Sequence, residues 1–135
     1  MRTITTAQDD AEAVRWYQLA AHQGDARAQV SLGFMYSNGN GVPQDYSKAM
    51  RWYQLAADQG NASAQTSLGF MYKYSSGVPQ DYVSAHMWLN IASANGGESS
   101  GKWRDEVATQ MTAEQIAEAQ NRAKVCLASN YQNCD

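Results

Sequence analysis

The chain has 135 residues, of which 44% are hydrophobic and 17% are charged, and its formal net charge is −3. No apolar run approaches the roughly 20 residues of a membrane-spanning helix, and the basic residues are scattered singly rather than clustered as phosphate binding requires. We therefore expect one domain with a sizeable core, no nucleic-acid partner and no insertion into a membrane.

The dominant feature of the sequence is an internal repeat with a period of 36 residues, seen where Trp16 returns as Trp52 and again as Trp88. Pro43 returns in the same way as Pro79. Self-similarity at one fixed period is the signature of a repeat architecture. We divide the single domain into 1–10 (tail of a preceding repeat), 11–46 (repeat 1), 47–82 (repeat 2), 83–129 (divergent repeat 3 and cap) and 130–135 (tail).

Each unit is predicted to hold two helices. In the second unit the first helix is expected over about 45–58 and the second from 62 to about 72. Acidic or amide side chains stand where each helix should begin and can accept hydrogen bonds from its first backbone N–H groups; they are Asp9, Asp45 and Asp81 for the first helices and Asp25 and Asn61 for the second. Gly24 and Gly60 follow the first helices, where a left-handed residue is favoured.

The apolar positions indicate how the helices pack. Ala13, Trp16, Tyr17 and Ala20 share one face of a helix, which predicts that the aromatic residues of this face are buried. Gly33 and Gly69 lie inside helices, where glycine costs about 1 kcal/mol relative to alanine. We interpret both glycines as points of close approach by a neighbouring helix.

The recurring residues resemble the Sel-one-like repeat, a relative of the tetratricopeptide repeat. The resemblance covers about residues 8–129 and in the first unit is carried by Ala13, Trp16, Tyr17, Ala20, Ala21, Gly24, Ala28, Leu32, Gly33, Tyr36, Gly39, Gly41, Val42, Asp45, Lys48 and Ala49. It implies an all-α solenoid of α/α hairpins that serves as a non-catalytic scaffold or adaptor for other proteins. In bacteria such proteins are often secreted or periplasmic.

The sequence departs from this pattern at Ser75, at Leu89, which replaces the tyrosine of the earlier units, and beyond Gly96. Ser75 replaces the glycine found at Gly39, which puts an identical turn there in doubt. Beyond Gly96 the third unit loses the repeat pattern, and residues 98–129 are expected to cap the open core against water. Thr112 and Gln115 have the spacing of a capping box at the start of the last helix.

A protein or peptide partner is expected on the polar stripe of the first helices, which should line the concave side of the solenoid. The stripe consists of Arg15, Gln18, His22, Arg51, Gln54, Asp58, Met87 and Asn90. Arginine suits the recognition of carboxylates, so an acidic segment is favoured. The alternative is that these positions are merely solvated.

Two other functions stay open. Members of the resembled family are reported to bind or cleave β-lactams, and Ser99-Ser100-Gly101-Lys102 matches the S-x-x-K string of serine β-lactamases. A weak hydrolase or small-ligand-binding protein is therefore the first alternative. The second is a structural fragment of a longer solenoid. In either case the uncapped first repeat could pair with a second copy as a homodimer.

The sequence predicts no cofactor and no metal, because His22 and His86 lie in different units without further ligands nearby. Cys126 and Cys134 form a candidate disulfide that would hold the C-terminal tail on the last helix. If this bond forms and a signal has been removed, the compartment would be periplasmic or extracellular. Otherwise it would be cytoplasmic.

Overall fold

The computed structural model describes the backbone of residues 6–135 and the surroundings of side chains from residue 9 onward. All regular elements in this range are helices, which confirms the all-α class. They are α1 (Thr6–His22), α2 (Ala26–Asn38), α3 (Tyr46–Ala57), α4 (Ala62–Tyr74), α5 (Tyr82–Ala94), α6 (Ser100–Ala108) and α7 (Ala113–Ala128). None of the described helices is long and apolar enough to cross a membrane.

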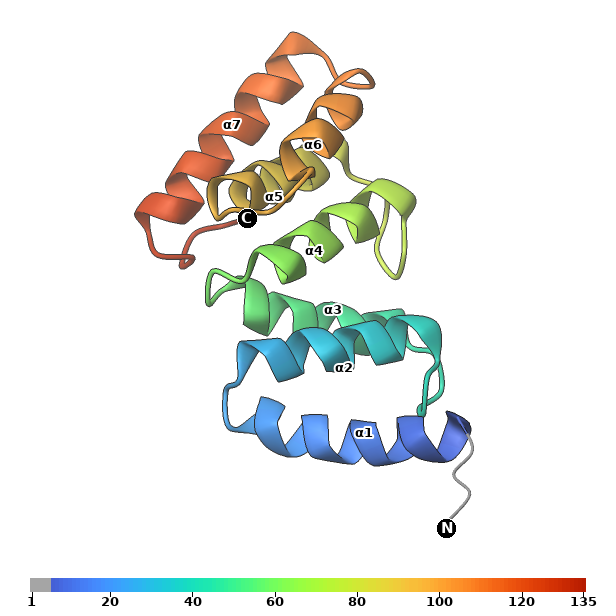
Figure 1. The fold of residues 1–135 in the computed structure, drawn as a ribbon. Coiled ribbons are helices and arrows are strands. Elements are labelled where there is room, and N and C mark those ends of the chain that lie inside the picture. Colours follow the sequence, from blue (N-terminus) through green and yellow to red (C-terminus); the bar gives the residue numbers. More distant parts are fainter. Residues whose placement is uncertain (1–5) are drawn as a thin grey trace.

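The helices are stacked in series along the molecule. From α1 to α5 each helix packs against the next one in the chain, and α5 then contacts both α6 and α7 (Figure 1). The hairpins α1–α2 and α3–α4 therefore lie side by side, as the repeat predicts. The third unit ends the series because α6 and α7 both pack on α5.

Side-chain caps fix where most of these helices begin. Asp25 and Asn61 accept hydrogen bonds from the backbone N–H groups of Ala28 and Ala64, each at 2.9 Å. Asp45 and Asp81 do the same for α3 and α5. These four predictions are confirmed.

The expected cap at Asp9 is wrong. Helix α1 begins at Thr6, so Asp9 lies in its first turn. Ala7 stands where the later units have Pro43 and Pro79. Without a proline to stop it, the helix extends backward, and an acidic residue in a first turn is favourable for the helix dipole.

The turn at Ser75 has the same conformation as the turn at Gly39. Ser75 ends α4 in the left-handed conformation with φ 58°, and Gly39 ends α2 in the same way with φ 70°. Left-handed backbone is unfavourable for serine. The Ser75 hydroxyl donates a 2.9 Å hydrogen bond to the carbonyl of Val78, which helps to offset this cost.

The two helical glycines are points of close approach, as predicted. A Cβ on Gly33 would lie 2.6 Å from Cε1 of Tyr53, and one on Gly69 would lie 2.8 Å from Cγ of Leu89. Residues 53 and 89 are one period apart, so the same contact joins α2 to α3 and α4 to α5. Tyr53 and Leu89 are buried.

The aromatic core expected in the first unit is missing on α1. Trp16 is 71% exposed, whereas Trp88, in the same register two units later, is 3% exposed. Tyr17 and Leu19 are exposed as well. The reason is positional, because no described helix covers the face of α1 that corresponds to the covered faces of α3 and α5.

A column of amide side chains, which the repeat pattern does not predict, links the units. Buried Gln65 donates to the carbonyl of Ala57 at 3.0 Å and accepts from Nδ2 of Asn95 at 3.0 Å. One unit earlier, buried Gln29 donates to the carbonyl of Ala21 and accepts from Gln59. Each buried glutamine thus donates to a backbone carbonyl of its own unit and accepts from an amide side chain of the next unit, which holds the two units in register.

The C-terminal segment closes the far end of the stack. Thr112 and Gln115 form the predicted capping box of α7. Cys126 and Cys134 are joined as a disulfide in the structure, with their Cα atoms 4.3 Å apart. The intervening Tyr131 hydroxyl accepts a 2.8 Å hydrogen bond from Asn95, which ends the amide column.

Candidate functional site

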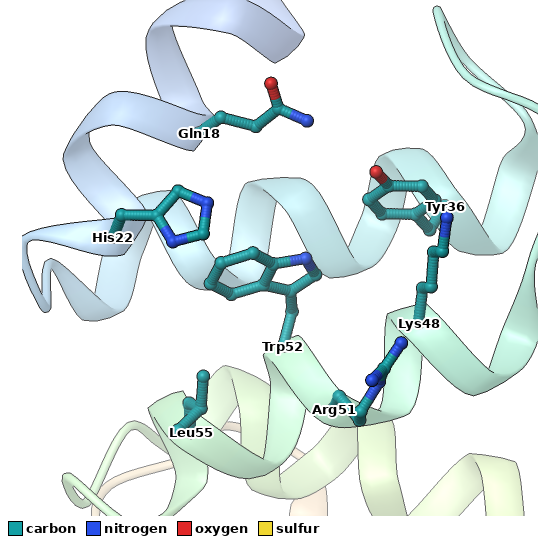
Figure 2. A pocket seen from close by; sticks show the side chains of 7 residues that line it. All are labelled: Gln18, His22, Tyr36, Lys48, Arg51, Trp52 and Leu55. Atoms are coloured by element: carbon teal, nitrogen blue, oxygen red, sulfur yellow. The ribbon is translucent and has the colours of Figure 1, made fainter.

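A groove of about 360 Å³ lies where α1, α2 and α3 meet. Figure 2 shows its side chains converging from three helices, with Trp52 between His22 and Arg51. The seven lining residues are Gln18, His22, Tyr36, Lys48, Arg51, Trp52 and Leu55. None of them is acidic.

Trp52 provides the apolar wall of this groove. Its ring is partly buried and packs against the first-unit core. The ring of His22, at the end of α1, meets it edge-on with centroids 5.2 Å apart and an interplanar angle of 73°. Leu55, one turn further along α3, is 50% exposed and extends the apolar surface.

Two cations stand beside this apolar wall. Lys48 places its Nζ 5.5 Å from the ring centroid of Tyr36, and Arg51 reaches toward the same side (Figure 2). Neither makes an ion pair with any residue in the described part of the chain. The groove therefore combines unpaired positive charge with exposed aromatic and aliphatic surface.

Three of the expected partner-binding residues meet in the groove, namely Gln18, His22 and Arg51. Arg15 lies outside it, on the outer side of α1 beside Trp16 and Leu19.

Gln54 and Asp58 do not line the groove. The side-chain amide of Gln54 instead donates a 2.9 Å hydrogen bond to the carboxylate of Asp58, which follows the end of α3.

The expected exposure of Met87 is wrong. Met87 is 1% exposed and belongs to a core cluster with Ala123 and Cys126 of α7. Asn90 is also engaged, because its side-chain oxygen accepts a 2.7 Å hydrogen bond from Arg104 of α6. The two terminal helices cover the face of α5 that is open on α3, so the polar stripe ends at the second unit.

Four further residues line the groove and lie outside the predicted polar stripe, namely Tyr36, Lys48, Trp52 and Leu55. The repeat predicts that Trp52, the counterpart of Trp16, lies on a buried aromatic face. The available signal was that Lys48 and Trp52 are four residues apart on one helix and so share a face with Arg51.

The two histidines lie on different helices, α1 and α5, and the described residues contain no group of three or more His, Cys, Asp or Glu side chains placed to hold a metal ion. His86 is buried on α5, and its Nδ1 has no hydrogen-bond partner among the described residues. Burial lowers the pKa of His86, the positive charge of Arg104 lowers it further, and Asp105 raises it in part. The imidazole therefore resists protonation in the folded protein.

The S-x-x-K string lies around the start of α6. Ser99 precedes the helix in the left-handed conformation with φ 62°, and its side chain makes no capping hydrogen bond. The next residue, Ser100, is fully buried and its hydroxyl lies 3.0 Å from Oγ1 of Thr66. Lys102 is exposed.

An all-α solenoid of repeated hairpins with a capped C-terminal end is the class of protein that these features define. The model of the Sel1 repeat matches residues 5–25, 26–61 and 62–97, so the chain belongs to the Sel1 repeat family. Proteins of this family are commonly protein-interaction scaffolds.

Two of the solved structures that are similar to this chain illustrate the likeness. One is a protective antigen present in uropathogenic Escherichia coli strains, which displays an SLR fold; it is 32% identical with a TM-score of 0.86 over 94% of this chain. The other is a Sel1 repeat protein from Oxalobacter formigenes, 41% identical with a TM-score of 0.60 over 62% of this chain. The matches span 28% and 63% of the lengths of those two proteins. No curated protein gives a match.

Proposed function

We propose that this chain is a protein-interaction module and that the α1–α3 groove binds an acidic peptide segment carrying an apolar side chain. The observation that carries the proposal is the pair of unpaired cations, Lys48 and Arg51, beside the exposed surface of Trp52. Family membership supports the general role, and the groove supplies the chemistry for a particular kind of partner.

The groove chemistry favours a carboxylate next to a hydrophobic group. An arginine can bind a carboxylate through two parallel hydrogen bonds, and a nearby lysine adds a mobile positive charge. Trp52 and Leu55 would bury the apolar side chain of the same segment, which is the larger source of affinity in most interfaces. Because the whole chain has a net charge of −3, attraction of an acidic partner requires this local arrangement of charges.

The test uses matched peptides and matched variants. Labelled peptides with leucine flanked by glutamate and aspartate are compared with twins that carry glutamine and asparagine. We expect the acidic set to bind and to weaken as salt is raised. Changing Arg51→Ala should lower the affinity at least about 10-fold, the usual effect of losing a charge-assisted hydrogen bond.

Arg27→Ala is the control, since Arg27 is an exposed arginine on α2 that does not line the groove. Equal binding by the acidic and amide peptides, or equal losses in the two arginine variants, would contradict the proposal. Steady turnover of a chromogenic β-lactam that disappears in Ser99→Ala would instead favour the hydrolase alternative.

A further inference from the structure

The α2–α3 side of the α1–α3 groove has a counterpart one period further along the chain, and there it is covered. The residues that repeat the groove are Tyr72 for Tyr36, Ser84 for Lys48, Met87 for Arg51, Trp88 for Trp52 and Ile91 for Leu55. We call these five later residues the counterpart surface. Leu55 is 50% exposed, whereas Ile91 is fully buried, and Trp88 is 3% exposed.

Helix α7 is the element that lies over the counterpart surface. It packs along α5 (Figure 1), and its Ala123 and Cys126 belong to one buried cluster with Met87 and Trp88. Ala119 is fully buried as well, so small side chains at i, i+4 and i+7 form one face of α7. Small residues let a helix lie close to its neighbour. The molecule therefore already seats a helix on a surface built like the α1–α3 groove.

The seated helix brings a positive charge to the counterpart surface. Burial raises the pKa of Tyr72, Asp135 and Asp81 raise it further, and the charge of Arg122 on α7 lowers it in part. Arg122 therefore acts beside this tyrosine, and it directly precedes Ala123 in the small-residue face.

In the α1–α3 groove the same place already holds a cation of the chain itself. Nζ of Lys48 lies 5.5 Å from the ring centroid of Tyr36, and Arg51 stands where the counterpart surface has uncharged Met87. A helix with arginine at the position of Arg122 would be repelled there. A helix with a carboxylate at that position would be attracted.

We propose that the α1–α3 groove receives its acidic partner as a helix, seated in the way that α7 is seated on the counterpart surface. This inference rests on the function proposed above and gives its partner a form. The partner helix presents small residues at i, i+4 and i+7 toward Trp52. An acidic residue directly before the second small residue meets Lys48 and Arg51.

The α7 helix of a second copy does not meet these requirements. It carries Arg122 where the groove calls for an acidic residue. It is also fixed to its own tail, because Cys126 is bonded to Cys134. The occupant is therefore a helix of another protein.

The probe is a labelled peptide of residues 112–129 with Arg122→Glu and Cys126→Ala. Its control carries Arg122→Lys, Lys124→Glu and Cys126→Ala, so both peptides have the same composition and net charge. Only the side of the helix that bears the third glutamate differs, since residue 124 is exposed on α7. With the full-length protein and no reductant, we expect the probe to bind at least about 10-fold more tightly than the control.

A third peptide tests the helical form by adding Gln120→Pro to the probe. Gln120 is exposed on α7, so proline breaks the helix and leaves the small-residue face and the charges in place. We expect at least about 10-fold weaker binding, and ¹³Cα shifts of the bound probe should be helical. Equal binding of the proline peptide, or an extended bound probe, would overturn this inference and leave the groove function standing.

Two variants of the protein locate the binding. Lys48→Glu should abolish the preference for the probe over the control. Arg27→Glu makes the same change of net charge outside the groove and should keep the preference. A preference that survives Lys48→Glu, or that both variants lose, would overturn the inference. If neither these peptides nor the acidic leucine peptides bind, the proposed function itself fails.

Discussion

At the scale of single residues, the same amino acid in the same register can have different consequences in different units. Tyr17 and Tyr53 are one period apart, but only Tyr53 has a described helix of the preceding unit against its ring. We expect Tyr53→Ala to lower the free energy of unfolding by about 3–5 kcal/mol, as large-to-small core changes do. Tyr17→Ala should cost less than about 1 kcal/mol, as a surface change.

Urea unfolding of the two variants measures this difference in one protein and one residue type. Equal costs for both changes would mean that the packing of Tyr53 on Gly33 contributes little.

His86 makes stability depend on pH. Its pKa is lowered from 6.5 by burial and then by Arg104, so the folded protein binds this proton less tightly than the unfolded chain does. The unfolded state therefore gains protons first as the pH falls below about 6.5. We expect stability to decline between pH 7 and pH 5, by at most about 1.4 kcal/mol per pH unit.

His86→Met is the matched variant, because the same register holds Met50 in the second unit. Urea unfolding at pH 7, 6 and 5 should give a shallower decline for this variant. The same slope in both proteins would show that other groups cause the pH dependence.

At the scale of elements, the last helix depends on the tail that returns to it. The disulfide joins Cys134 of the tail to Cys126, which is fully buried on α7. Tyr131 between them accepts from Asn95 at the end of α5. Cys134→Ser should lower stability by about 2–3 kcal/mol, chiefly by releasing a short loop in the unfolded state.

The measurement compares the natural protein and the variant by urea unfolding, with and without reductant. Intact mass of the unreduced natural protein should be lower by two hydrogens than that of the reduced protein. If reductant leaves the natural protein as stable as before, the bond does not form in solution or does not contribute.

At the scale of the whole molecule, the repeat period was sufficient to predict the fold. A glycine that ends one helix, a capping residue that begins the next and a proline that interrupts the chain recur together and define helical hairpins. Hairpins with aromatic faces must stack to bury these faces. The helices, four of the caps and the close approaches at Gly33 and Gly69 followed from this reasoning.

The wrong burial predictions concern the two ends of the repeat, where residues in the same register have different surroundings. Periodicity shows which face of a helix corresponds to which, but it does not show what covers that face. Trp16 was therefore expected to be buried and is exposed, and Met87 was expected to be exposed and is buried. The groove was only partly predicted for a related reason, because Tyr36 and Trp52 meet across helices and no stripe on one helix reveals that contact.

Among the described elements, the C-terminal end of the stack is closed and the end at α1 is open, so the two ends differ in stability. The bonded tail and the tyrosine over the last amide hold α5 and α7 together, whereas α1 packs mainly on α2 and meets α3 through the His22–Trp52 ring contact. Spontaneous opening should therefore begin at α1 and proceed toward the tail. In a solenoid of this kind, the surface that is open to contact is also the one that loosens first.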